Sequence, residues 1–207
     1  MKQESCVRKK FKIAITGNIG TGKTTISKII VELGFKVFQS DREVEKIYLY
    51  NDVKLNIALA FSDKIKNLKK PDGQIDKKLL SDHVFDNESE LKKLENIIYP
   101  ELNKQRKFFL ESNPNEKALF FDIPLLFEKN LYNSYDKIIY LYTDESTKKK
   151  RVLERKNMTE EKIDKILKNQ ISDISKFEKF ISLKINTNCT REHLKDKIEH
   201  FTNRLFT

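Results

Sequence analysis

Cysteine is scarce in this 207-residue chain, which contains only Cys6 and Cys189. Two cysteines so far apart build neither a disulfide framework nor a metal knuckle, and this favours a reducing, cytoplasmic location. Long apolar runs are missing as well, because no stretch approaches the roughly 18 residues that span a bilayer. Residues 1–10 are polar and basic and lack the apolar centre of a secretory signal. We therefore expect neither a membrane partner nor secretion.

Glycine is also rare, and its distribution is uneven. Three of the five glycines, Gly17, Gly20 and Gly22, fall in one six-residue stretch. The chain is 38% hydrophobic and 10% aromatic, which is enough to bury a core, so wholesale disorder is not expected despite 35% charged residues. This length accommodates one α/β domain with small insertions.

The positive charge of the chain, formally +10, comes mostly from lysine, because 34 lysines accompany only 7 arginines. Clusters of Lys and Arg attract nucleic acids, but here no segment interleaves basic residues with aromatics. The densest run, residues 148–151, has acidic residues before and after it. We therefore interpret most lysines as a solvated surface and expect no nucleic-acid partner.

Five short apolar runs have the composition of buried strands. Helical periodicity separates them, which predicts an α/β fold with an open, parallel, five-stranded sheet flanked by helices. Residues 51–115 contain no convincing strand and are interpreted as a helical insertion. The predicted strands are residues 11–16, 35–38, 118–121, 137–142 and 181–185, and the main predicted helices are residues 23–33, 41–50, 79–84, 91–110 with an interruption at Pro100, 148–155, 160–171 and 191–205.

The glycine-rich stretch GNIGTGKT, residues 17–24, fits the pattern G-x-x-x-x-G-K-[ST] between a predicted strand and a predicted helix. Such a phosphate loop, or P-loop, wraps its backbone N–H groups around the β-phosphate of a nucleoside triphosphate, beside the positive end of the following helix. Lys23 is expected to reach the β- and γ-phosphates, and the Thr24 hydroxyl is expected to ligate Mg²⁺. A dinucleotide-binding loop is disfavoured, because its glycines follow the different order G-x-G-x-x-G.

Two acidic residues end predicted strands, at the edge where open α/β sheets bind ligands. A carboxylate at Asp41 can hold or deprotonate a hydroxyl that attacks the γ-phosphate; capping of the next helix is the alternative. Asp122 is expected to orient Mg²⁺ through water; a turn at the strand end is the alternative.

Arg151 and Arg155 stand four residues apart on one predicted helix and would share a face. In a chain so rich in lysine, two retained arginines suggest bidentate contacts to phosphate. Their helix and the next one, preceded by the predicted N-caps Thr143-Asp144 and Thr159, would close over the nucleotide as a lid. A solvated helix face is the alternative interpretation.

The chain resembles the dephospho-CoA kinases, in order and along almost its whole length. The most specific similarity is the segment DIPLLFE, residues 122–128. The other similar segments and residues are 13–25, 33–37, Ser40-Asp41, 98–100, Arg151, Arg155, Gln170 and 185–188. The departures from the family pattern are Asn18 for a common Gly, Tyr99 for the usual His, Lys156 where an Arg-Asp pair normally continues, and Asn186 for a frequent Asp.

The resemblance implies a three-layer P-loop NTPase fold in which residues 11–50 and 116–207 form the core, with a lid at about 145–172 and a CoA-binding region at 51–115. It also implies transfer of a phosphoryl group from ATP, with Mg²⁺, to the ribose 3′-hydroxyl of dephospho-CoA; a monomer is favoured. The implied residues are Asp41, Lys23 and Arg151 for catalysis; Asn18, Ile19, Gly20, Thr21, Gly22, Lys23, Thr24, Thr25, Arg151 and Arg155 for the nucleotide; Asp41, Tyr99, Pro124 and Leu125 for the acceptor; and Thr24 and Asp122 for the metal.

Two alternatives remain. The first is another small-molecule kinase of the shikimate or nucleotide type, since residues 38–45 also resemble the acceptor side of shikimate kinases. Those enzymes carry a glycine-rich acceptor loop, whereas only Gly34 and Gly73 lie outside the phosphate loop here. The second is a P-loop regulator that binds nucleic acid, which an acidic Walker-B run and basic-aromatic segments would favour; neither is apparent.

Overall fold

The structure is a computed structural model that describes residues 10–84, 87–155 and 158–207. Cys6 and Lys156 therefore lie outside the described residues. The chain packs as two units, a core of residues up to Gln39 and from Asn115 to Thr207, and a helical unit from Ser40 to Pro114. The predicted functional division at residues 51 and 115 stays a prediction.

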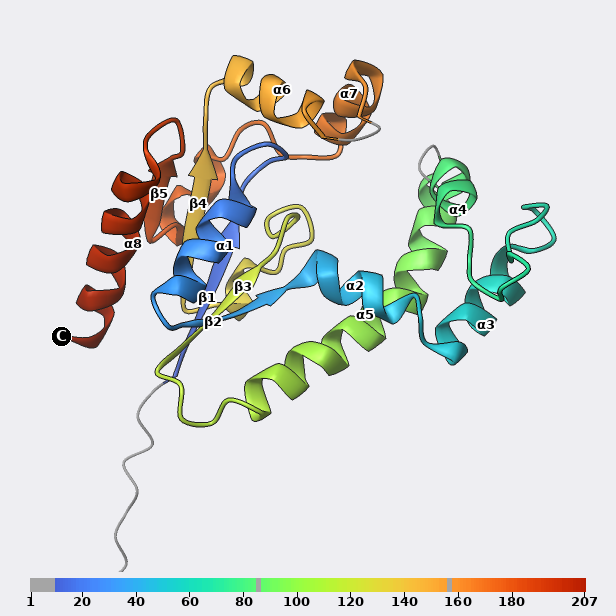
Figure 1. Cartoon of the computed structure of the whole chain (residues 1–207), viewed down its shortest axis with the longest axis horizontal. Coiled ribbons are helices and arrows are strands. Elements are labelled where there is room, and N and C mark those ends of the chain that lie inside the picture. Colours follow the sequence, from blue (N-terminus) through green and yellow to red (C-terminus); the bar gives the residue numbers. More distant parts are fainter. Residues whose placement is uncertain (1–9, 85–86, 156–157) are drawn as a thin grey trace, which may run out of the picture. The chain divides into compact units, whose positions relative to one another are not determined.

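The core contains a parallel sheet of five strands (Figure 1), β1 (Phe11–Thr16), β2 (Lys36–Gln39), β3 (Ala118–Asp122), β4 (Lys137–Tyr142) and β5 (Leu183–Asn186). Their order in the sheet is β2-β3-β1-β4-β5. The predicted five-stranded parallel sheet is thus confirmed. Because β1 lies in the middle, the loop that follows it leaves the sheet between the carboxyl ends of β3 and β4.

One face of the sheet is covered by α1 (Lys23–Glu32) and α8 (Arg191–Phe206), which lie side by side (Figure 1). Alternate residues of each strand point toward them, as the two-residue period of a strand requires. The buried aliphatic and aromatic side chains of this layer are Ile13, Ile15, Ile26, Ile29, Ile30, Phe120, Ile139, Leu141, Ile185, Leu194 and Ile198.

Aromatic side chains pack around Tyr140 of β4, whose side chain points to the other face of the sheet. The Phe127 ring stacks on Phe177 at 4.6 Å between centroids and lies 6.3 Å from Tyr140 of β4. Tyr132 joins Phe127 to Phe180 with centroid distances of 6.1 and 4.5 Å. We call Phe127, Tyr132, Tyr140, Phe177 and Phe180 the aromatic cluster. Tyr132 comes from the short helix η1 (Tyr132–Ser134), and Phe177 and Phe180 come from the short helix η2 (Ser175–Phe180).

Two helices, α6 (Glu145–Leu153) and α7 (Glu160–Lys168), follow β4. Their predicted N-caps are confirmed: the Asp144 carboxylate accepts from the N–H of Thr147, and the Thr159 hydroxyl accepts from the N–H of Lys162. In Figure 1 both helices lie beyond the carboxyl end of β4, on the side where the phosphate loop leaves β1. They are the predicted lid.

The helical unit consists of α2 (Ser40–Ile47), α3 (Asn51–Phe61), α4 (Lys77–Val84) and α5 (Glu88–Glu111), with α5 packed against the other three. The predicted break at Pro100 is wrong, because α5 continues through it. Pro100 removes one backbone hydrogen bond, to the carbonyl of Asn96, but both residues are exposed, so water can replace that bond. Across the described part of the chain, no helix has both the length and the hydrophobicity to cross a bilayer.

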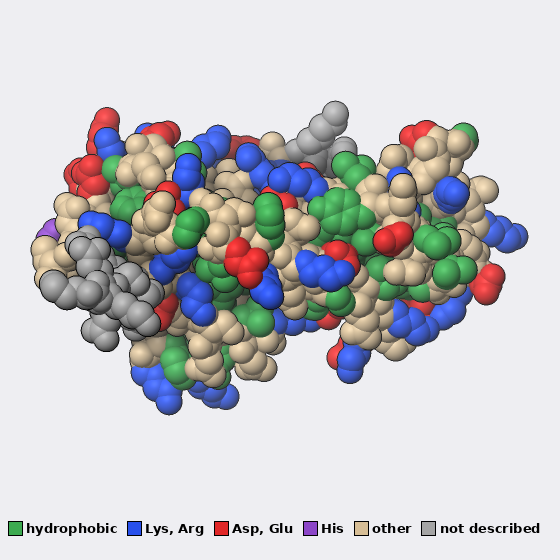
Figure 2. Space-filling model, turned by 90° about the horizontal axis from the view of Figure 1, so that it is seen from below, with side chains coloured by type: hydrophobic (Ala, Val, Ile, Leu, Met, Phe, Trp, Pro, Cys, Tyr) green, Lys and Arg blue, Asp and Glu red, His purple; other side chains and the backbone are tan. Residues whose placement is uncertain are grey.

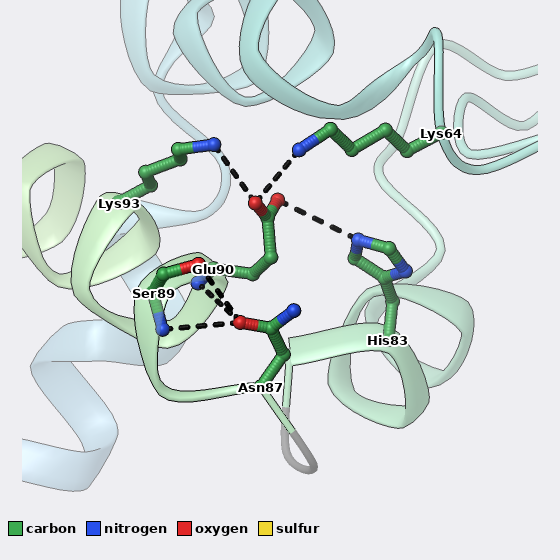
Figure 3. A network of polar contacts seen from close by, with 6 residues as sticks. All are labelled: Lys64, His83, Asn87, Ser89, Glu90 and Lys93. Atoms are coloured by element: carbon green, nitrogen blue, oxygen red, sulfur yellow. Dashed lines mark hydrogen bonds and ion pairs between the residues drawn. The ribbon is translucent and has the colours of Figure 1, made fainter.

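A buried carboxylate, Glu90 of α5, contacts side chains from α4, from α5 and from the segment that follows α3 (Figure 3). Its Oε1 accepts from the ammonium groups of Lys64 and Lys93 at 2.7 and 2.8 Å, and its Oε2 lies 3.6 Å from His83 Nε2. Asn87 caps the same helix by accepting from the N–H of Glu90 at 3.2 Å. The hydrogen bonds from Lys64 and then Lys93 lower the pKa of Glu90 from 4.5 to about 2.

Replacing Glu90 by Gln should lower the melting temperature at pH 7, because Lys64 and Lys93 lose their charged partner. The lowered pKa in the folded state means that this stabilisation is fully present above pH 4.5 and is lost as the pH falls toward 2. We therefore expect the difference in melting temperature between the wild type and Glu90→Gln to shrink below about pH 5. Glu88→Gln, an exposed change on the same helix, is the control, and a difference that stayed constant with pH would contradict the assignment.

Candidate active site

The phosphate loop connects β1 to α1 with a backbone that requires its glycines. Gly20 has φ +81°, and a Cβ there would lie 2.8 Å from the carbonyl oxygen of Lys148. Gly22, with φ +85°, precedes α1 and has no side chain to cap it. The N–H groups of the first turn of α1, Lys23 and Thr24 among them, therefore face the loop, where an anion can accept from them.

The ammonium group of Lys23 lies over this loop. It donates to the carbonyl oxygens of Gly17 at 2.5 Å and Asn18 at 3.2 Å. The Thr21 hydroxyl also donates to the Asn18 carbonyl, at 2.7 Å, and closes the turn. The sequence pattern thus corresponds to a folded loop with a cation at its mouth, the arrangement that binds the phosphates of a nucleoside triphosphate.

Thr24 and Asp122 offer the oxygen ligands that Mg²⁺ prefers. Asp122 ends β3 in register with Ile15 of β1, and its Oδ2 accepts from the Ser27 hydroxyl at 3.4 Å. Thr24 is exposed and lies three residues before Ser27, one turn nearer the loop. Within the described residues, no group of three or more His, Cys, Asp or Glu could hold a metal ion.

Arg151 lies beside the phosphate loop. Its guanidinium donates to the hydroxyl and the carbonyl of Thr187 at 2.9 and 2.8 Å, and to the carbonyl of Gly20 at 3.5 Å. Arg155 differs from the sequence-based expectation, because α6 ends at Leu153 and Arg155 is an exposed residue of the following turn. The two arginines therefore do not share a helix face.

Thr187, which accepts two hydrogen bonds from Arg151, is a site residue that the sequence did not predict. Thr187 directly follows β5 and is buried, and a Cβ on Gly22 would lie 3.6 Å from its hydroxyl oxygen. It therefore fills the space between Arg151 and the start of α1. Thr187 lies two residues past the predicted strand 181–185 and within the family-like segment 185–188, but a threonine at the end of a strand is too common to indicate this contact.

The loop also contacts the segment that leaves the lid. The N–H of Ile19 donates to Gln170 Oε1 at 2.9 Å, and Asn18 Nδ2 donates to the carbonyl of Ile171 at 3.3 Å. A cavity of about 360 Å³ is lined by the loop residues Asn18 and Thr21 and by Lys148, Leu167 and Gln170. A second cavity, of about 490 Å³, begins at Lys137 at the amino end of β4 and contains none of the predicted site residues.

The remaining predicted residues divide between the two units. Pro124 lines a small cavity with Gly17 and Asn18, and Leu125 follows it in the core. Asp41 is an exposed residue in the first turn of α2, and Tyr99 lies on α5, where its hydroxyl donates to Glu95 Oε1 at 3.0 Å. Asp41 and Tyr99 therefore belong to the helical unit.

Charged side chains of both signs are mixed on the face of the molecule drawn in Figure 2. On the face drawn in Figure 2, Lys and Arg side chains are dispersed among acidic and hydrophobic ones. Many described lysines are paired with neighbouring acids, among them Lys46 with Glu43 and Lys104 with Glu101. These pairs neutralise part of the lysine charge locally; the absence of a nucleic-acid partner stays a prediction.

Known proteins resemble this chain along most of its length. The family model described as dephospho-CoA kinase matches residues 11–190. A dephospho-CoA kinase of Fusobacterium nucleatum is 35% identical over 189 residues, which are 91% of this chain and 95% of that protein. The solved dephospho-CoA kinase of Campylobacter jejuni has a TM-score of 0.64 at 29% identity, covering 94% and 97% of the two chains. A protein from Thermus thermophilus shares the fold with a TM-score of 0.81 at 22% identity, covering 95% and 98%. Because the family model covers residues 11–190 and a relative is 35% identical over 91% of the chain, the chain belongs to the dephospho-CoA kinase family.

Proposed function

We propose that this chain transfers the γ-phosphoryl group of ATP to the 3′-hydroxyl of the ribose of dephospho-CoA, giving CoA and ADP. The family match over residues 11–190 carries the proposal. Neither a shikimate- or nucleotide-type kinase nor a nucleic-acid-binding regulator is favoured, because the relatives of this chain are named dephospho-CoA kinases.

The nucleotide is bound in this proposal by the phosphate loop, residues 17–24, together with Thr25 and the lid arginines. The backbone N–H groups of the loop and of the first turn of α1 donate to the phosphate oxygens, and Lys23 neutralises the β- and γ-phosphates. Arg151, placed by Thr187, and Arg155 compensate the charge that develops on the transferred group. In phosphoryl transfer, positioning and electrostatic stabilisation of this kind supply most of the rate enhancement.

Mg²⁺ completes the nucleotide site in the proposal. Thr24 would ligate it directly and Asp122 through water, so that one hydroxyl and one carboxylate suffice beside the phosphate oxygens. When bound, the metal neutralises phosphate charge during transfer. The Ser27 hydroxyl, 3.4 Å from Asp122, orients that carboxylate.

The acceptor is oriented by Asp41, with Tyr99, Pro124 and Leu125 as further contacts. Asp41 follows Gln39 by two residues, and Gln39 is the β2 residue in register with Asp122. This position, at the carboxyl end of neighbouring strands, suits a carboxylate that orients or deprotonates an attacking hydroxyl. Tyr99 stands where the family usually has His, and its hydroxyl oxygen, whose O–H donates to Glu95, replaces the imidazole as a polar contact for the acceptor.

The proposed substrates also bear on where the protein acts and on its partners. The reaction uses small, water-soluble substrates, and we propose that it takes place in the cytoplasm, in a monomer that needs neither a membrane nor a nucleic acid. A protein–DNA complex seen in a gel-shift at physiological salt would contradict the proposal that no nucleic acid is bound, since non-specific binding to DNA weakens steeply at that salt concentration.

An acceptor comparison tests the proposed reaction. ADP release measured in a coupled assay should depend on dephospho-CoA and not on adenosine, shikimate or pantothenate. Asp41→Asn should lower kcat by about 10²- to 10³-fold, because the amide cannot take the hydroxyl proton. Asp52→Asn, an exposed change in the first turn of α3, is the control. Activity confined to another acceptor would overturn the substrate assignment, and full activity of Asp41→Asn would overturn the role of Asp41.

A further inference from the structure

The segment between α7 and η2, residues 169–174, connects the lid to the aromatic cluster. We call it the strap. One side of the strap contacts the phosphate loop, where Gln170 Oε1 accepts from the N–H of Ile19 and the Ile171 carbonyl accepts from Asn18 Nδ2. The strap therefore meets the loop at two consecutive residues, one through its backbone and the other through its side chain.

The other side of the strap is held by a carboxylate. The N–H of Ile171 donates to Glu128 Oε1 at 2.9 Å, so the peptide groups on either side of Ile171 bond in different directions, one to Glu128 and one to Asn18. Glu128 is the last residue of the DIPLLFE segment. It is half-buried and lines, with Asn18 and Ile171, a cavity of about 10 Å³, hardly enough for one water molecule.

Packing fixes the position of Glu128. The preceding residue, Phe127, is buried in the aromatic cluster and stacks on Phe177, which follows the strap. The stacked rings therefore hold both partners of the hydrogen bond between Ile171 and Glu128. Phe127 precedes Glu128, and Phe177 lies three residues after the end of the strap at Ile174. The backbone that carries Glu128 is therefore held in place by the packing of its neighbour Phe127.

From these contacts we infer that Glu128 is a positioning residue for the nucleotide site, acting through the strap on the phosphate loop. It holds the Ile171 peptide, which places Gln170 and the Ile171 carbonyl against Ile19 and Asn18 and so keeps the loop in its phosphate-binding shape. The inference rests on the proposed function for the identity of the nucleotide, but not for that of the acceptor.

Nucleotide binding without an acceptor tests the inference. Glu128→Ala should raise the Kd of a non-hydrolysable ATP analogue with Mg²⁺, measured by calorimetry, by about 3- to 10-fold, which is the effect of losing one hydrogen bond. Glu128→Gln should restore near-normal affinity, because its amide oxygen still accepts from Ile171. In turnover, the KM for ATP should rise while the KM for dephospho-CoA stays unchanged. Glu199→Ala, an exposed change on α8, is the control.

A double-mutant cycle separates positioning from general stability. Gln170→Ala removes the contact to Ile19 from the other side of the strap and should give a similar rise in Kd. If both residues act through the strap, the double variant should bind about as weakly as the weaker single variant. Additive effects would overturn the inference, as would normal nucleotide affinity in Glu128→Ala or equal losses in Glu128→Ala and Glu128→Gln. Because these measurements use no acceptor, a wrong assignment of dephospho-CoA would leave their outcome unchanged.

Discussion

Replacing Lys23 by Ala is expected to lower the kcat for phosphorylation of dephospho-CoA by about 10³-fold or more. The Lys23 ammonium lies over the carbonyls of Gly17 and Asn18, at the mouth of the loop. In the proposed reaction it would neutralise the phosphates between which the bond breaks, and no other side chain of the loop carries a charge. The loss should appear in ADP release at saturating ATP, where weaker binding alone is compensated.

Lys28→Ala provides the matched control for Lys23→Ala. Lys28 is exposed on α1, so the change removes the same charge from the same helix but not from the loop. We expect Lys28→Ala to keep nearly normal turnover and both variants to melt close to the wild type. Near-normal turnover in Lys23→Ala would contradict the assignment of the loop as the nucleotide site.

Arg151→Ala is expected to have an effect of the same order, about 10³-fold on kcat. Arg151 reaches the loop at Gly20 while two of its hydrogen bonds go to Thr187. This fork holds a delocalised charge beside the phosphates, and lysine cannot reproduce it. Arg151→Lys should therefore recover only part of the activity.

Thr187→Val distinguishes the charge of Arg151 from its structural contacts. Valine keeps the shape of the buried threonine but removes the hydroxyl that accepts from Arg151 at 2.9 Å. The carbonyl of residue 187 still accepts from the guanidinium, so we expect a loss of only about 3- to 10-fold. If Thr187→Val were as inactive as Arg151→Ala, Arg151 would serve to anchor Thr187 rather than to stabilise the reaction. Lys150→Ala, on the exposed face of α6, is the control for a lost charge.

The sheet and the phosphate loop could be predicted because they depend on local patterns. β4 lies at the predicted residues 137–142, and β1 at residues 11–16, because apolar runs bounded by turn residues are typical of buried parallel strands. Gly17, Gly20 and Gly22 mark the loop, since few other residues adopt its backbone. The five-stranded order also follows the common crossover geometry of such folds.

The contacts around the loop could not be predicted, because they join residues far apart in the chain. Arg151 and Thr187 are 36 residues apart, and Asn18 and Ile171 are 153 apart. The continuation of α5 through Pro100 reflects tertiary packing that outweighs a local preference: Ile98 and Leu102 on either side are buried on one face. Arg155 shows the reverse error, because the helical pattern persisted two residues past the end of α6.

The order of the strands in the sheet also has a consequence for synthesis on the ribosome. β1 emerges early, but its two neighbours, β3 and β4, begin only at Ala118 and Lys137. At about 5–20 residues per second, the apolar segment FKIAIT therefore remains without a sheet partner for roughly 5–20 s. The helical unit, whose contacts are local, has been made by then and can fold first. Nascent chains halted before residue 118 should consequently depend on chaperones that bind exposed apolar segments, and that dependence should end once β4 has emerged.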